Sequence, residues 1–134
     1  MTSADIVVGL AYGDEGKGAT TDKLAVERKA KRVVRFNGGQ QAEHNVIANG
    51  RHHTFSSYGS GTLAGVPTFI GPKCTTNPLA VVAEARHLRR VLTTTTRRIQ
   101  IHESALVTTQ LHIMMNHWRE TARGDARHGS TGTG

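Results

Sequence analysis

The sequence predicts an α/β domain: a P-loop-like, mainly parallel sheet with flanking helices and a β-hairpin. Three observations predict this class. A β-branched stretch at residues 5–11 leads into a glycine-rich turn, and a segment suited to a helix and a second apolar stretch follow it. An Asn-Gly dipeptide at residues 49–50 separates two extended stretches. Apolar residues then recur at helical spacing twice in the second half of the chain.

The first half of the chain predicts a βαβ unit followed by the hairpin. Residues 5–11 have the pattern of a buried strand, residues 16–31 can form a helix without an internal proline, and residues 32–36 form a second strand. This order favours a parallel sheet with a right-handed crossover. Residues 37–39 (Asn-Gly-Gly) predict a loop, and residues 44–48 and 51–57 pair around the Asn-Gly turn.

The second half predicts two strands and two helices. Residues 68–70 form a short strand within a stretch rich in Gly and Pro. Pro78 opens a helix with Asn77 as its N-cap, and residues 98–102 alternate as a strand. The buried face of the first helix consists of Val81, Ala85, Leu88 and Leu92. The last helix is predicted to have Leu111, Met114, Met115 and Trp118 on one face, with Met114, Met115 and Trp118 in the core.

Composition narrows the classes of partner and the compartment. The 134 residues carry a formal charge of +7, which suits phosphorylated small molecules as well as nucleic acid. No aromatic residues interleave the arginines of the second half, which favours a solvated face over a nucleic-acid groove. These arginines are Arg86, Arg89, Arg90, Arg97 and Arg98.

The single cysteine, Cys74, fits a reducing compartment, and the sequence shows neither a signal peptide nor an apolar stretch of membrane-spanning length. We therefore expect a cytoplasmic protein with no membrane partner.

Residues 13–18 (GDEGKG) form a candidate phosphate-binding loop. Glycines allow a tight turn that presents backbone N–H groups to phosphate, and Lys17 supplies a positive charge beside a helix N-terminus. The Walker pattern is incomplete, because Ala11 and Gly18 replace its first glycine and its Ser or Thr. Spacing alone therefore leaves phosphate binding and a plain glycine-rich turn equally open. Asp14 and Glu15 suit a loop that also handles a proton or a divalent metal.

Four motifs in order carry a family resemblance: GDEGKG at residues 13–18, VVRFNGG at 33–39, Ala-x-His at 42–44 and HGSTG at 128–132. This series resembles the opening of the adenylosuccinate synthetase family. The resemblance implies that residues 1–134 are the N-terminal nucleotide-binding part of a ligase of purine biosynthesis. Such a ligase uses GTP to phosphorylate the 6-oxygen of IMP, and L-aspartate then displaces the phosphate to give adenylosuccinate. It also implies Mg²⁺ and a homodimer in the complete protein.

The resemblance carries site roles onto matching residues. Asp14 would remove the N1 proton of IMP, and His44 would donate to the γ-phosphate during transfer. GTP would be bound by Gly13, Asp14, Glu15, Gly16, Lys17, Gly18, Glu43, His44 and Asn45. IMP would be bound by Asp14, Glu15, Gly16, Lys17, Gln41, Ala42, Glu43, His44 and Thr131. Mg²⁺ would be bound by Asp14 and by Glu43. In the inferred topology, Asp14 and His44 lie at the ends of two adjacent parallel strands, where α/β sheets gather ligands.

Departures from the family pattern keep other interpretations open. Glu43 stands where the family has glycine, Ala19 replaces a usual lysine, and the family's later segments for guanine and aspartate have no counterpart, so we expect a fragment. One alternative is a catalytically inactive remnant that binds GTP or another purine nucleotide. A second is a relative that acts on dGMP to make a 2-aminoadenine precursor, although retention of Asp14 favours IMP. A nucleic-acid-binding protein is a third, without any recognisable reading motif. His52 and His53 are predicted to be solvated.

Overall fold

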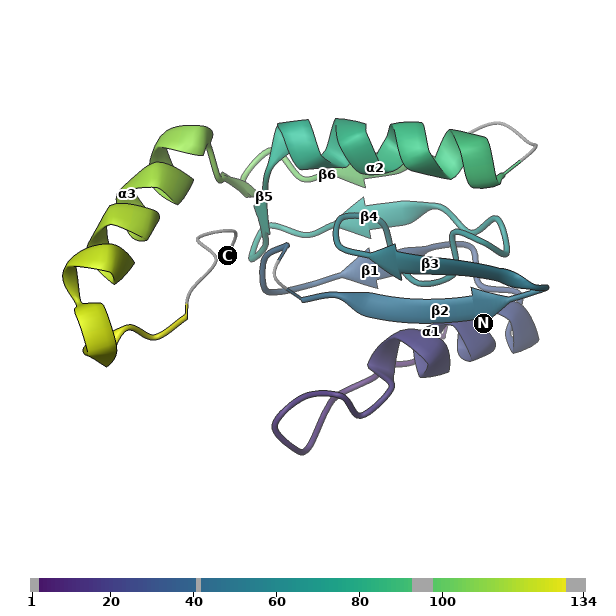
Figure 1. Ribbon diagram of the computed structural model, residues 1–134. Helices are drawn as coiled ribbons and strands as arrows, with labels where there is room; N and C mark the ends of the chain where they lie inside the picture. Colours follow the sequence, from purple (N-terminus) through teal and green to yellow (C-terminus); the bar gives the residue numbers. More distant parts are fainter. Residues whose placement is uncertain (1–2, 41, 93–97, 130–134) are drawn as a thin grey trace.

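The computed structural model describes residues 3–40, 42–92 and 98–129 (Figure 1). Its helices in these ranges are α1 (Lys17–Glu27), α2 (Pro78–Val91) and α3 (Gln110–Ala122), with a 3₁₀ turn at Gly124–Ala126. Its strands are β1 (Val33–Arg35), β2 (His44–Ala48), β3 (Arg51–Phe55), β4 (Thr68–Ile70), β5 (Thr75–Thr76), β6 (Ile99–Ile101) and β7 (Leu106–Val107). The predicted site residues Gln41 and Thr131, and also Arg97, lie outside the described residues. Within those ranges, no helix is both long and apolar enough to cross a bilayer.

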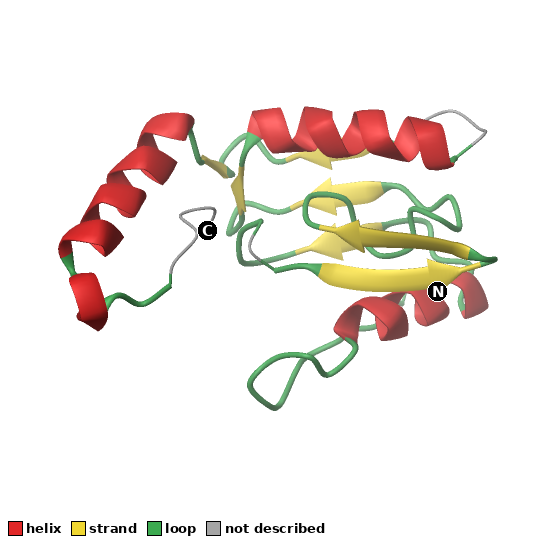
Figure 2. Cartoon of the chain, in the orientation of Figure 1, coloured by secondary structure: helices red, strands yellow, loops and turns green. Residues whose placement is uncertain are grey.

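A three-stranded parallel sheet confirms the predicted α/β class (Figure 2). Its order is β1-β4-β6, with β4 in the centre. The β2–β3 segment lies between β1 and β4 along the chain, and α2 lies between β4 and β6. Parallel neighbours require such long connections, because their ends cannot be joined by a tight turn. A second, two-residue parallel pair joins β5 to β7 beside the sheet.

The hairpin β2–β3 forms as predicted. Asn49 and Gly50 both have positive φ, at 52° and 71°, which is the backbone of the type I′ turn that suits twisted strands. The antiparallel register places Val46 opposite His53 and His44 opposite Phe55. Val46, His53 and Phe55 are buried, whereas Ile47 on the other face is 78% exposed. The hairpin therefore presents one face to the core and one to solvent.

The predicted first strand, residues 5–11, does not form. The backbone of this segment is irregular, and Ile6 and Leu10 are 74% and 97% exposed (Figure 1). Strand propensity expresses packing on a pleated surface more than an intrinsic preference, and no described strand of the sheet pairs with these residues. The candidate phosphate-binding loop is consequently preceded by irregular backbone. At the other end of α1, Lys29 has φ 50° and ends the helix earlier than residue 31.

Helix α2 covers one side of the hairpin and closes the larger part of the core. Pro78 stands at its first turn, and the Asn77 side chain accepts hydrogen bonds from the backbone N–H groups of Leu79 and Ala80. The predicted apolar face is confirmed, with the side chain of Leu88 fully buried. The core cluster consists of Val46, Phe55, Tyr58, Val81, Leu88 and Leu92. A smaller cluster of Ala25, Val33 and Val66 lies between α1 and β1.

The cap of α2 gives a first prediction. Replacing Asn77 by alanine leaves two N–H groups at the helix start without their acceptor, and we expect the free energy of unfolding to fall by about 1 kcal/mol. Urea denaturation measures this change. Asn37→Ala, in an exposed loop, is the matched control with an expected change below about 0.5 kcal/mol. Equal effects of the two substitutions would contradict the capping role.

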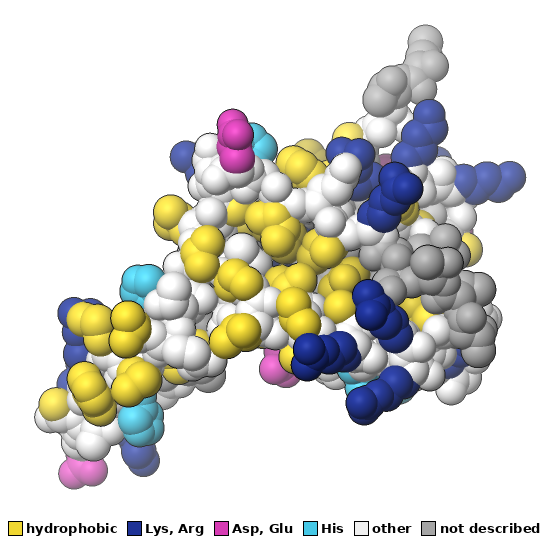
Figure 3. Space-filling model, turned by 90° about the horizontal axis from the view of Figure 1, so that it is seen from above, with side chains coloured by type: hydrophobic (Ala, Val, Ile, Leu, Met, Phe, Trp, Pro, Cys, Tyr) yellow, Lys and Arg dark blue, Asp and Glu magenta, His cyan; other side chains and the backbone are white. Residues whose placement is uncertain are grey.

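The predicted core face of α3 is exposed. Leu111 and Trp118 are 69% and 64% exposed, and Met114 and Met115 are each 47% exposed. Figure 1 shows α3 extending away from the sheet, and Figure 3 shows apolar side chains gathered on the surface over this part of the chain. The helical period was correct, but it identifies an apolar face without identifying what covers that face. Assigning Met114, Met115 and Trp118 to the core was therefore wrong for the described residues.

Candidate functional site

The predicted phosphate loop is a turn that leads directly into a helix N-terminus. Gly13, Asp14 and Gly16 have φ of 118°, 55° and 75°, and α1 begins at Lys17. Left-handed backbone is open to glycine and tolerated by Asp, which explains these residue types at these positions. Gly16 is the N-cap and supplies no side-chain acceptor, and the first turn of α1 holds no acidic residue. The first N–H groups of α1 therefore remain available to an anion.

Lys17 is engaged by a carboxylate of its own loop. The Glu15 carboxylate accepts hydrogen bonds from the Lys17 ammonium and from the backbone N–H of Ala11, the latter at 3.1 Å. The hydrogen bond from Lys17 is the main reason why the pKa of Glu15 falls to about 2. A phosphate oxygen that binds Lys17 must therefore share or replace the Glu15 carboxylate.

Close packing joins the phosphate loop to His44. Gly18, in the first turn of α1, is buried against the start of β2, and a Cβ added there would lie 2.7 Å from His44 Cβ and 3.3 Å from the Asn45 carbonyl oxygen. Burial lowers the pKa of His44, and the positive charges of Arg35 and Lys17 lower it further. The imidazole is consequently neutral at pH 7, a form that carries one N–H donor.

The Gly18 contact predicts an inverted effect of alanine in a helix. Alanine normally stabilises a helix over glycine by about 1 kcal/mol, but overpacking against strand backbone costs about 1–3 kcal/mol. We expect Gly18→Ala to lower the free energy of unfolding by about 1–2 kcal/mol in urea denaturation. Thr20→Ala on the exposed face of α1 is the control, with an expected change within about 0.5 kcal/mol. A more stable Gly18→Ala variant would contradict this expectation and show that β2 shifts away from the added methyl group at little cost.

The remaining described residues of the predicted site are exposed or half-buried around β2. Ala42 and Glu43 precede the strand, Ala42 half-buried and Glu43 exposed. The Asn45 side chain lies on the solvent face of the hairpin, where its oxygen accepts a hydrogen bond from the Thr54 hydroxyl at 2.6 Å. The same oxygen lies 3.2 Å from Nε2 of His52. Asn45 thus stabilises the hairpin through its side chain in this structure.

The structure brings Lys17, Gly18 and His44 together, but by a different route from the predicted one. His44 begins an antiparallel hairpin strand, and Asp14 follows irregular backbone, so the expected placement at the ends of two adjacent parallel strands is wrong. The packing of α1 against β2 joins the two segments instead. This contact depends on a glycine in the helix.

Sequence reasoning missed a buried carboxylate, Glu84 on α2. Its oxygens accept hydrogen bonds from the backbone N–H groups of residues 56–58, at 2.6 Å from Ser57. Nε2 of His53 lies 3.2 Å from Glu84 Oε1, and both side chains are buried. The prediction of a solvated His53 is therefore wrong, although His52 is exposed. The sequence did offer a signal that Glu84 is buried, because this residue lies between Val81 and Leu88 on the apolar face of α2.

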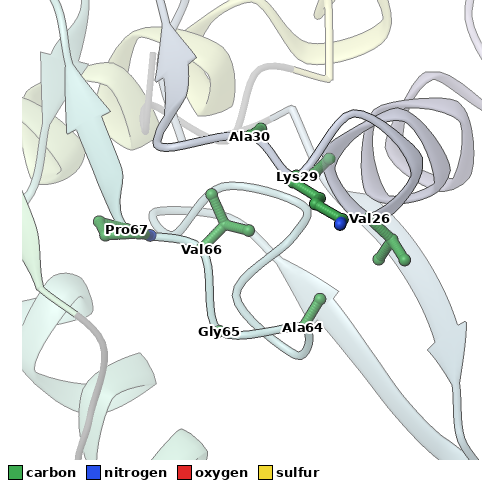
Figure 4. Close-up of a pocket in the computed structure, with 8 residues that line it drawn as sticks. Val26, Lys29, Ala30, Ala64, Gly65, Val66 and Pro67 are labelled. Carbon is green, nitrogen blue, oxygen red and sulfur yellow. The ribbon is translucent and has the colours of Figure 1, made fainter.

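A shallow pocket lies away from these residues (Figure 4). It is lined by Ala25, Val26, Lys29, Ala30 and residues 64–67. These residues lie at the C-terminal end of α1 and in the turn before β4, whereas the phosphate loop is at the opposite end of α1. The pocket is therefore separate from the candidate site.

Named proteins of one family match this chain in sequence along its length. A sequence model of the family described as adenylosuccinate synthetase matches residues 6–134. Adenylosuccinate synthetase 2 of Chromobacterium violaceum and the adenylosuccinate synthetase of Mannheimia succiniciproducens are each 36% identical over 135 residues. That of Acidithiobacillus ferrooxidans is 35% identical. Each alignment covers 100% of this chain, and the chain spans 31% of the length of each relative.

Solved structures share the fold. The fully ligated adenylosuccinate synthetase of Plasmodium falciparum matches with a TM-score of 0.75 and 21% identity, over 90% of this chain and 28% of that chain. The cyanophage S-2L succinoaminodeoxyadenylate synthetase, bound to dGMP and dATP, matches with a TM-score of 0.64 and 18% identity. That match covers 84% of this chain and 30% of the phage chain. With its sequence matched from residue 6 to residue 134, this chain belongs to the adenylosuccinate synthetase family.

Proposed function

We propose that this chain is the N-terminal nucleotide-binding part of a GTP-dependent ligase that joins IMP and L-aspartate into adenylosuccinate. The observation that carries the proposal is the contact between Gly18 and His44, in a chain of this family. The neutral imidazole of His44 beside the loop that holds Lys17 supports a site that combines a phosphate-binding charge with a hydrogen-bond donor. A cytoplasmic location and a homodimer in the complete protein belong to the same proposal.

The proposed chemistry starts with a proton transfer. The Asp14 carboxylate, exposed at the tip of the loop, accepts the N1 proton of IMP, which makes the 6-oxygen a stronger nucleophile. The 6-oxygen attacks the γ-phosphorus of GTP, and GDP leaves. Lys17 and the N–H groups at the start of α1 stabilise the phosphate charge, and His44 donates its N–H to a phosphoryl oxygen. The amine of L-aspartate then attacks C6 and expels the phosphate.

Mg²⁺ belongs to the proposal as an ion shared with the nucleotide. Among the described residues, no three His, Cys, Asp or Glu side chains lie close enough to bind a metal by themselves. The Asp14 carboxylate and the backbone carbonyl of Glu43 are hard oxygen donors, which suit an ion that takes one or two protein ligands and completes its shell with phosphate and water. When bound, the ion would supply neutralisation of phosphoryl charge.

Binding of GTP by the purified chain tests the proposal. Isothermal titration calorimetry with GTP, in buffer that contains Mg²⁺, is expected to show saturable binding. Lys17→Ala is expected to weaken the affinity for GTP about tenfold or more, because a charge-assisted hydrogen bond is lost. Lys23→Ala, exposed on the same helix, is the matched control and should bind as the parent does. Absence of GTP binding, or equal loss in both variants, would refute the proposed nucleotide site.

Adenylosuccinate formation separates the ligase from its alternatives. With GTP, IMP and L-aspartate we expect product from a form of the chain completed with the family's later segments, and Asp14→Asn in that form should reduce the rate by a factor of about 10² or more. GTP binding without product from IMP or dGMP would favour the inactive remnant that Glu43 suggests. Product from dGMP in place of IMP would favour the reaction class of the phage relative, which was solved with dGMP.

A further inference from the structure

Glu84 is the centre of a buried hydrogen-bond network at the base of the hairpin. Its carboxylate accepts from three successive backbone N–H groups, those of Ser56, Ser57 and Tyr58, and from the Ser56 hydroxyl at 3.3 Å. It also contacts His53 within β3. Burial alone would raise the pKa of Glu84, but the hydrogen bonds and the neighbouring His53 lower it. One carboxylate on α2 thus fixes the chain as it leaves the hairpin.

A second set of contacts connects this network to the segment that enters the hairpin. The Arg35 guanidinium donates to the Ser56 carbonyl oxygen and, at 3.0 Å, to the Gly39 carbonyl oxygen. The buried Gln40 side chain donates to the Ser57 hydroxyl. Residues 39–40 lead into β2, which begins at His44, and residues 56–58 follow Phe55, the cross-strand partner of His44. The segment before His44 and the segment after its cross-strand partner Phe55 are therefore both tied to residues 56–58, which Glu84 holds.

We infer that Glu84 is a positioning residue for His44, acting through residues 56–58, Arg35 and Gln40. The inference rests on the proposed function insofar as His44 is the donor there. In this inference the buried Glu84 side chain on α2 holds the His44 imidazole in place, although the two residues lie on different elements. A carboxylate suits this task because one group can accept from several N–H donors at once, whereas an amide offers a single oxygen.

The spectroscopic signature of this role is the proximity of His44 to Gly18. Because a Cβ on Gly18 would lie 2.7 Å from His44 Cβ, the chain should show a nuclear Overhauser effect between Gly18 Hα and His44 Hβ protons. We expect Glu84→Gln to abolish this effect while the secondary chemical shifts of α1 and β2 remain. Val81→Ala removes volume from the same face of α2, keeps the carboxylate, and is expected to retain the effect as a matched control.

Ser57→Ala keeps the backbone donor to Glu84 but removes the acceptor of Gln40, and it should weaken the Gly18–His44 effect at least twofold. If Glu84→Gln does not fold, an unchanged effect in Ser57→Ala would show that the contact with Gln40 does not place His44, and would overturn the inference. Retention of the effect in Glu84→Gln, or equal loss in Val81→Ala, would overturn the inference and leave Glu84 with a role in stability only. The measurement needs no nucleotide, so a failure to bind GTP would count against the proposed function and not against the positioning of His44.

Discussion

Replacing Phe55 by alanine is expected to lower the free energy of unfolding by about 3–5 kcal/mol. Its side chain is fully buried in the cluster between the hairpin and α2, and its ring meets that of His53 edge-on at 4.5 Å between centroids. The substitution removes apolar contact and leaves a cavity in a close-packed interior. A loss of this size is a large share of the stability of a small domain, about 5–15 kcal/mol. Urea denaturation at neutral pH measures it.

Phe36→Ala provides the matched control for this substitution. Phe36 follows β1 and is 52% exposed, so its truncation should cost less than about 1 kcal/mol. A similar midpoint shift in the two variants would show that the cluster between the hairpin and α2 does not carry the stability of the fold. Because Phe55 is opposite His44 in the hairpin, the Phe55 variant should also weaken GTP binding.

Glu84→Ala is expected to destabilise the chain by about 3 kcal/mol or more at pH 7, because several buried N–H groups lose their acceptor at a cost of about 1–3 kcal/mol each. His53 and the N–H groups of Ser57 and Tyr58 would lose their acceptor. The pKa of Glu84 is held below its ordinary value of 4.5 in the folded chain. Its contribution to stability is therefore present above 4.5 and is lost as the pH falls through the lowered folded value.

Urea denaturation of parent and variant across this range checks both parts of the prediction. The difference in unfolding free energy should be largest near neutral pH and should narrow in acid below 4.5. Glu103→Gln, at an exposed turn residue, should show a small difference at every pH. A gap between parent and Glu84→Ala that stays constant into acid would show that the charge of Glu84 contributes nothing and that only its volume matters.

Local backbone chemistry in the sequence determined much of the fold. The Asn49–Gly50 pair accepts left-handed backbone, so the hairpin could be predicted from two residues. Asn77 followed by Pro78 predicted the start of α2, and three of its four apolar positions proved to be buried. The strands of the parallel sheet were located to within one or two residues, because each is a short apolar stretch bounded by turn residues.

The glycine-rich loop at residues 13–18 was also predictable in its local form. Glycines at 13 and 16 take the positive φ that the turn needs, and α1 begins at Lys17. The strand expected before the loop did not form, since a strand requires a paired neighbour that a linear pattern does not identify. The assignment of catalytic and ligand-binding roles came from family resemblance and stays a prediction to be tested by the experiments above.

Only the tertiary structure decided which groups meet across the chain. Periodicity showed an apolar face on α3, but the arrangement of the elements leaves that face exposed. A histidine in a hairpin and a glutamate in a helix, 31 positions apart, looked independent until packing buried them as a pair. The approach of Gly18 to His44 likewise depends on how α1 lies against β2. Local patterns fix backbone conformation because they act through neighbouring residues, whereas burial and charge pairing depend on contacts that form only when distant segments pack together.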